Sequence, residues 1–143
     1  MDNCSELTDE QFAAAFADCS LPPELFNHEA HLRLAWIHLK ASGRKEATDN
    51  VCTQIAAFAR HYGAKDKYHH TLTVAAVNIV HHFMQKGKAA NFTELLHEFP
   101  QLKTKFTILI GSHYSADILQ SDRARAGYLA PDLLPFNFGN GPG

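Results

Sequence analysis

Apolar residues recur at three- and four-residue intervals along most of the chain, the spacing typical of amphipathic helices. The side chains of Thr8 and Asn27 can cap helix starts, and Gly63 lies where a left-handed helix end would fall. The pattern predicts helices over residues 9–19, 28–41, 45–62 and 67–86, a short helix between Asn91 and Pro100, and a sixth from Lys103 to about Ile110.

The remaining segments carry weaker helical signals and no strand pattern. Ser115 and Ser121 can cap single helical turns, and residues 131–136 are expected to lie extended, with their apolar side chains covering the core. We expect residues 139–143 to be disordered. No segment shows the alternation of apolar and polar residues that would indicate a strand. The sequence therefore predicts an all-α fold, a compact single-domain bundle of about five to six helices over residues 1–143 with an extended C-terminal tail.

The composition of the chain limits which partners the protein is expected to bind and in which cellular compartment it is expected to lie. The chain has 143 residues, enough for one domain with a buried core, and its 13 Lys and Arg against 15 Asp and Glu give a formal charge of −2. With no basic field to gather phosphates, we expect no nucleic-acid partner. Acidic residues stand where a signal peptide would be cationic, and no apolar run approaches the roughly 18 residues of a membrane span. Three cysteines without CxxC spacing fit reduced thiols, so we expect a cytoplasmic protein.

Histidine is enriched, with ten residues in the chain, and two clusters open expected helices. At about 100° per residue, His28 faces the apolar stripe of its helix and His31 lies on the edge of that stripe. The same construction turns His69 inward, next to Tyr68. Imidazole is the commonest protein ligand for metals of borderline softness. We therefore predict His28, His31 and His69 as ligands of one divalent ion, zinc or iron, and Tyr68 as a catalytic proton donor.

The other candidates have ordinary structural interpretations. Glu94 and His97 have the spacing of a di-iron half-motif, but such bundles need two copies. Arginines that could hold a substrate carboxylate more often lie in solvent or at helix ends. We assign packing or surface roles to His38, His61, His81, His82, His97 and His113, and to Arg33, Arg123 and Arg125.

Three motifs follow one another along the chain: FNHEAHLRLAW at residues 26–36, KYHHT at 67–71 and PDLLP at 131–135. With them the chain resembles an uncharacterised family of small bacterial all-helical proteins that carry FxHxxHLRLAW, KYHxT and PDLxP. The resemblance implies that residues 28, 31 and 69 are motif positions of that family. It implies no activity.

These observations support three hypotheses. The first is a metal-dependent enzyme that acts on a small molecule, in which the ion polarises a carbonyl or activates water; hydrolysis, lyase chemistry and oxygen activation all stay open. The second is a non-catalytic module that binds a small anionic ligand at two helix starts, with histidines as structural or hydrogen-bonding groups. The third is a helical interaction protein with structural histidines. A homo-oligomer is compatible with each.

Overall fold

The computed structural model describes residues 7–136 of the chain, and over this range it contains helices and loops but no strand. The all-α fold class predicted from the sequence is therefore confirmed. Contacts between residues group into two compact units, a first that ends at Tyr68 and a second that begins at His69. One domain over residues 1–143 stays a prediction, and the expected disorder of residues 139–143 lies outside the described residues.

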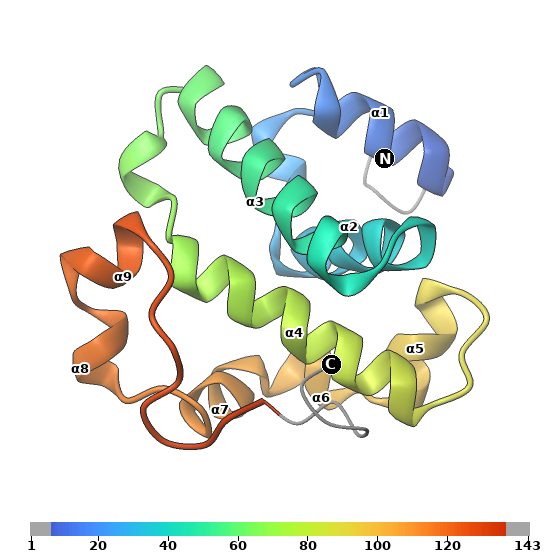
Figure 1. The fold of residues 1–143 in the computed structure, drawn as a ribbon. Helices are drawn as coiled ribbons and strands as arrows, with labels where there is room; N and C mark the ends of the chain where they lie inside the picture. Colours follow the sequence, from blue (N-terminus) through green and yellow to red (C-terminus); the bar gives the residue numbers. More distant parts are fainter. Residues whose placement is uncertain (1–6, 137–143) are drawn as a thin grey trace. The chain divides into compact units, whose positions relative to one another are not determined.

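Between residues 7 and 68, the first unit contains three α-helices around an aromatic core (Figure 1). They are α1 (Asp9–Ala17), α2 (His28–Ala41) and α3 (Arg44–His61), with 3-10 turns η2 at Pro23–Leu25 and η3 at Lys65–Lys67. α3 contacts both α1 and α2. Phe16 is fully buried, and its ring centroid lies 4.6 Å from that of Phe26 and 4.6 Å from that of Phe58. Burial of these large apolar rings supplies much of the driving force for folding this unit.

Side-chain caps begin the first two helices at the predicted residues. Thr8 Oγ1 accepts the Gln11 amide at 3.0 Å, and Gln11 Oε1 accepts the Thr8 amide at 3.0 Å, which completes a capping box. Asn27 Oδ1 accepts the Ala30 amide at 2.9 Å. These bonds connect residues three positions apart, so a short sequence window is enough to predict them.

A residue in the left-handed region ends α1. Cys19 has φ 62°, a conformation that costs a residue with a side chain roughly 1–2 kcal/mol. In this turn the Ser20 amide donates to the Ala15 carbonyl at 2.9 Å, and the Tyr62 hydroxyl donates to the Cys19 carbonyl at 2.8 Å. The helix therefore ends at Ala17, before the predicted boundary at residue 19.

Arg33 has a structural role, but it lies neither in solvent nor at a helix end, where such arginines were expected; it lies inside α2. Its guanidinium donates to Asp9 Oδ1 at 3.0 Å and to the Leu7 carbonyl at 2.6 Å, and it lies 4.9 Å from the centroid of the Phe12 ring. The side chain is only 12% exposed. These contacts hold α1 against α2.

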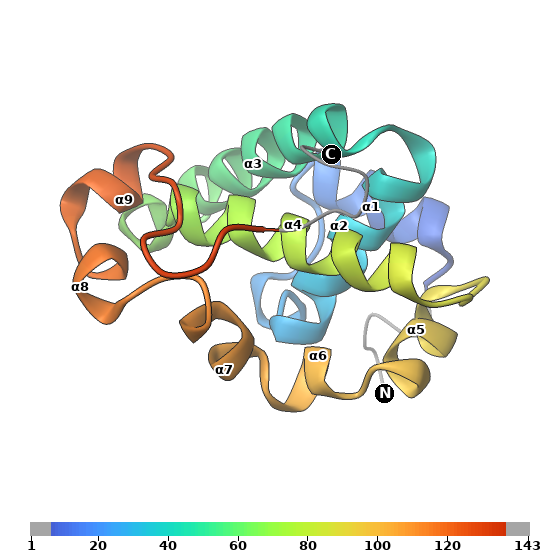
Figure 2. The same cartoon turned by 60° about the horizontal axis from the view of Figure 1, so that its bottom comes forward.

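The second unit is arranged around one long helix (Figures 1 and 2). Its helices are α4 (His70–Lys86), α5 (Phe92–Glu98), α6 (Gln101–Thr104), α7 (Phe106–Gly111), α8 (Ala116–Leu119) and α9 (Asp122–Ala126). α4 contacts both α7 and α9. It begins at His70 rather than at residue 67, because Tyr68 and His69 are extended, with ψ of 134° and 105°.

After α9 the C-terminal segment, residues 127–136, returns along the second unit (Figure 2). The buried Thr71 hydroxyl donates to the Gly127 carbonyl at 2.8 Å and accepts the Leu129 amide at 3.0 Å. The buried Tyr114 hydroxyl donates to the Leu129 carbonyl at 2.8 Å. Hydrogen bonds therefore anchor the segment. Leu133 and Leu134 are 57% and 55% exposed, so the expectation that its apolar side chains cover the core is wrong for these two residues.

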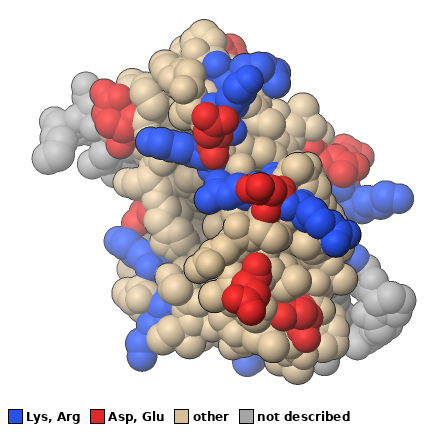
Figure 3. Space-filling view, turned by 90° about the vertical axis from the view of Figure 1, so that its left-hand side faces the viewer, with Lys and Arg blue, Asp and Glu red and all other residues tan. Residues whose placement is uncertain are grey.

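The surface carries charges of both signs. Figure 3 shows Lys and Arg side chains interspersed with Asp and Glu side chains on one face, without a patch of a single sign. Among the described helices, none has both the length and the apolar character needed to cross a membrane.

Candidate functional site: the predicted histidines and a pocket in the second unit

His69 is the N-cap of α4. Its Nδ1 accepts the Leu72 amide at 3.0 Å, and its Nε2 lies 2.8 Å from the Leu119 carbonyl oxygen. Because Nδ1 accepts, it carries the lone pair, and Nε2 carries the hydrogen and donates. Both nitrogens are thus engaged with the backbone of the second unit. A metal ion could bind His69 only after one of these hydrogen bonds broke.

His28 and His31 lie at the start of α2, and both are exposed, so His28 does not face the core as expected. The first turn of α2 turns Ala30 inward instead. His31 Nδ1 lies 2.9 Å from the Asn27 carbonyl oxygen and donates to it, and the His31 ring stacks on Phe26 with centroids 3.8 Å apart. This packing lowers the pKa of His31 because it removes water from one ring face; charge on His28 acts in the same direction, and the bond to Asn27 opposes both.

Tyr68 is half-buried at the end of the first unit. Burial raises the pKa of the Cys52 thiol, and a hydrogen bond with Tyr68 offsets part of that rise. The Tyr68 hydroxyl is therefore engaged with a buried thiol of α3.

Within residues 7–136, no three His, Cys, Asp or Glu side chains gather in a group that could hold a metal ion. The zinc or iron site at His28, His31 and His69, with Tyr68 as proton donor, stays a prediction. The contacts of His69 and Tyr68 described above favour structural roles for both.

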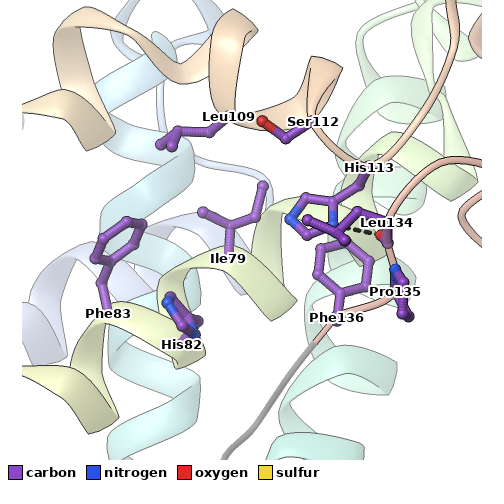
Figure 4. Close-up of a pocket in the computed structure, with 9 residues that line it drawn as sticks. All are labelled: Ile79, His82, Phe83, Leu109, Ser112, His113, Leu134, Pro135 and Phe136. Atoms are coloured by element: carbon purple, nitrogen blue, oxygen red, sulfur yellow. Dashed lines mark hydrogen bonds between the residues drawn. The ribbon is translucent and has the colours of Figure 1, made fainter.

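A cavity of about 280 Å³ lies in the second unit, between α4, α7 and the C-terminal segment (Figure 4). Most of its walls are apolar, and the polar side chains among them are two histidines and a serine. None of the described residues that line it is Lys, Arg, Asp or Glu. The lining residues are Ile79, His82, Phe83, Leu109, Ser112, His113, Leu134, Pro135 and Phe136.

His113 connects the helical wall of this pocket to the C-terminal segment. Its Nδ1 lies 2.7 Å from the Leu134 carbonyl oxygen, its own carbonyl accepts the Leu133 amide at 3.0 Å, and its ring stacks on Phe136 with centroids 4.2 Å apart. Figure 4 shows the second ring nitrogen, Nε2, on the side of the ring that faces Ile79. Three contacts therefore determine the position of one polar atom in the pocket, His113 Nε2.

The sequence interpretation assigned His82 and His113 to packing or the surface, and so missed this pocket. His113 follows a helix of six residues, too short for periodicity to show which way its side chain points. The signal that could have led to it is the PDLLP motif, because a segment that returns over the helices has to contact residues far away in sequence.

No family model, no curated protein and no solved structure matches the chain. The resemblance to a family of small bacterial helical proteins therefore stays a prediction.

Proposed function

We propose that the protein is a small-molecule-binding module and that its binding site is the pocket of the second unit. The observation that supports this most directly is a cavity of about 280 Å³ with mostly apolar walls and one oriented polar atom, His113 Nε2. Binding sites for small molecules commonly combine such walls with a few well-placed polar groups. An engineered cavity of about 150 Å³ is large enough to bind benzene, so this one suits a one- or two-ring compound.

The lining chemistry favours binding over catalysis. The described lining residues include no carboxylate, thiol or amine, so the imidazoles of His82 and His113 are the groups among them that could act as a base, and Ser112 is the group that they could activate. Ser112 is the one hydroxyl among them, and it donates its hydrogen to the Ile108 carbonyl at 3.2 Å rather than to a histidine. A serine activated by a base would need that hydrogen to point at the base. We therefore propose the binding module rather than the metal-dependent enzyme, with a ligand site whose described lining residues do not include His28, His31 or His69.

A cytoplasmic location is part of this proposal. Cys19 and Cys52 are free thiols in the described chain, and free thiols suit a reducing compartment.

An isotope-labelled sample titrated with toluene, p-cresol and indole would test the site. We expect saturable shifts of the amide signals of Leu109, Ser112 and His113 with at least one of these compounds. Ser112 is exposed at the pocket, so Ser112→Trp should fill it and weaken binding by about tenfold or more, equivalent to at least about 1.4 kcal/mol. Thr107→Trp is the matched control, because Thr107 is also exposed on α7 and does not line the pocket.

Two results would contradict the proposal. One is the absence of saturable binding by any of the three compounds to the wild-type protein. The other is equal affinity of the wild type and Ser112→Trp, which would place the bound compound elsewhere.

A further inference from the structure

The polar atoms of the pocket also limit the chemistry of its ligand. Resting on the function proposed above, we infer that the ligand is a neutral one- or two-ring compound with an O–H or N–H group, and that His113 Nε2 accepts this hydrogen. Three observations support it: the hydrogen position on His113, the lack of Lys, Arg, Asp and Glu among the described lining residues, and the apolar side chains of the walls.

The partner of His113 Nδ1 determines where the ring hydrogen lies. The Leu134 carbonyl can only accept, so at a distance of 2.7 Å Nδ1 must be the donor. In the neutral ring the lone pair then belongs to Nε2. Among the described residues, no donor reaches Nε2, which lies on the pocket side of the ring (Figure 4). Neutral His113 therefore presents the pocket with an acceptor rather than a donor.

Three contacts hold this acceptor in place before a ligand arrives. The ring donates to Leu134, stacks on Phe136, and belongs to a residue whose carbonyl accepts the Leu133 amide. An acceptor that is already oriented loses little conformational freedom on binding, so more of its hydrogen-bond energy contributes to affinity. Ser112 Oγ can also accept, because its hydrogen is directed to Ile108. Both side chains thus favour a ligand that donates.

The charge of the walls disfavours an anion. The described lining residues include no Lys or Arg, and an anion partly removed from water without a counter-charge is strongly destabilised. This inference therefore replaces the small anionic ligand expected from the sequence with a neutral one.

The apolar walls suit the body of a ring compound. Phe83 and Phe136 contribute aromatic rings, and Ile79, Leu109 and Leu134 contribute branched aliphatic side chains. Aromatic rings favour contact with other rings at offset or edge-on geometry. A planar ring between these walls could bring its polar hydrogen to His113 Nε2.

Matched pairs of probes test the inference with the wild-type protein. p-Cresol differs from toluene by a hydroxyl, and indole differs from 1-methylindole by its N–H. We expect the donor of each pair to bind about fivefold more tightly, the effect of one neutral hydrogen bond. A purely apolar pocket would give the opposite order for p-cresol and toluene, because the hydroxyl group would have to leave water unpaired. Benzoate is the anionic probe, and we expect it to bind most weakly.

His113→Asn tests whether Nε2 is the acceptor. An asparagine amide can still donate to the Leu134 carbonyl from near the position of Nδ1, but it has no group at the position of Nε2. We expect the variant to bind toluene and to lose the preference for p-cresol. Ser112→Ala, which keeps His113, should retain that preference. Thermal unfolding of both variants would show that they are folded before their affinities are compared.

The outcomes separate this inference from the proposed function. If toluene and 1-methylindole bind as tightly as p-cresol and indole, the pocket binds ligands but the inference about His113 is overturned. Tightest binding by benzoate would also overturn it, in favour of an anionic ligand. If no probe binds, the proposed function itself fails. Retention of the p-cresol preference in His113→Asn would show that another group accepts the hydrogen.

Discussion

Replacing His69 with alanine would remove both hydrogen bonds that its ring makes in the second unit. The bond from the Leu72 amide caps α4, and losing an N-cap of this kind costs about 1 kcal/mol. The bond to the Leu119 carbonyl is part-buried and neutral, and contributes about 1 kcal/mol more. We therefore expect His69→Ala to lower the free energy of unfolding by about 2 kcal/mol.

His69→Asn is the matched variant. Asparagine is among the preferred N-cap residues, so it can still accept the Leu72 amide, but its side chain is too short to replace the bond to Leu119. We expect a loss of about 1 kcal/mol, half that of the alanine variant. Urea unfolding followed by circular dichroism would measure both losses. The slope of the unfolding free energy against urea should match that of the wild type, because the fold is unchanged.

Equal losses in the two variants would refute the capping role, and a loss of less than about 0.5 kcal/mol in His69→Ala would refute both bonds. Zinc provides a separate comparison. If His69 were a metal ligand, zinc would stabilise the wild-type protein and not His69→Asn, since binding to the folded state alone raises stability. We expect the difference in free energy of unfolding between the wild type and His69→Asn to be the same with and without zinc.

Three further predictions follow from single residues. Cys19→Gly should raise the free energy of unfolding by about 0.5–1 kcal/mol in urea, because glycine adopts the left-handed conformation of residue 19 without the steric cost, and Cys19→Ala should give no such gain. Gly87→Ala should lower it by about 1–3 kcal/mol, because the added methyl group would overlap the Phe99 ring and the Glu98 carboxylate, which accepts the Lys88 amide; unchanged stability would contradict the packing at this turn. Hydrogen bonds from Ser115 lower the pKa of Asp132 below its usual value of 3.8, so their stabilising effect is present above that pH and is lost as the pH falls through the lowered pKa. The urea midpoint of wild type relative to Asp132→Asn should therefore decline below about pH 4, and a constant difference down to pH 2 would contradict this account.

Helix starts were predictable because the interactions that determine them are local. Asn27 begins α2 at His28 through a bond that spans three residues, and the helix ends at Ala41 as predicted. The start of α4 was predicted too early. There the N-cap is His69, and histidine is not among the residues preferred at this position, so the sequence carries no clear signal for it.

The candidate site was less predictable, because periodicity shows which side of a helix a residue occupies but not what lies opposite. His69 was expected to point inward, and it does contact protein, yet its Nε2 partner is 50 residues later in the chain. His113 lies between two short helices, and its partners Leu134 and Phe136 belong to an irregular segment. Contacts of this kind arise only when the chain has folded back on itself, so no short window contains them.

The position of His113 links attachment of the C-terminal segment to binding of a compound in the cavity. One ring nitrogen holds the C-terminal segment, and the other faces the cavity. Thermodynamic linkage makes the effect reciprocal: if the attached segment raises the affinity for a compound in the cavity by some factor, the bound compound lowers the equilibrium constant for opening of the segment by the same factor. The Leu133 amide bonds to the His113 carbonyl, so its hydrogen-exchange protection would measure how much a bound compound lowers the open population of the segment.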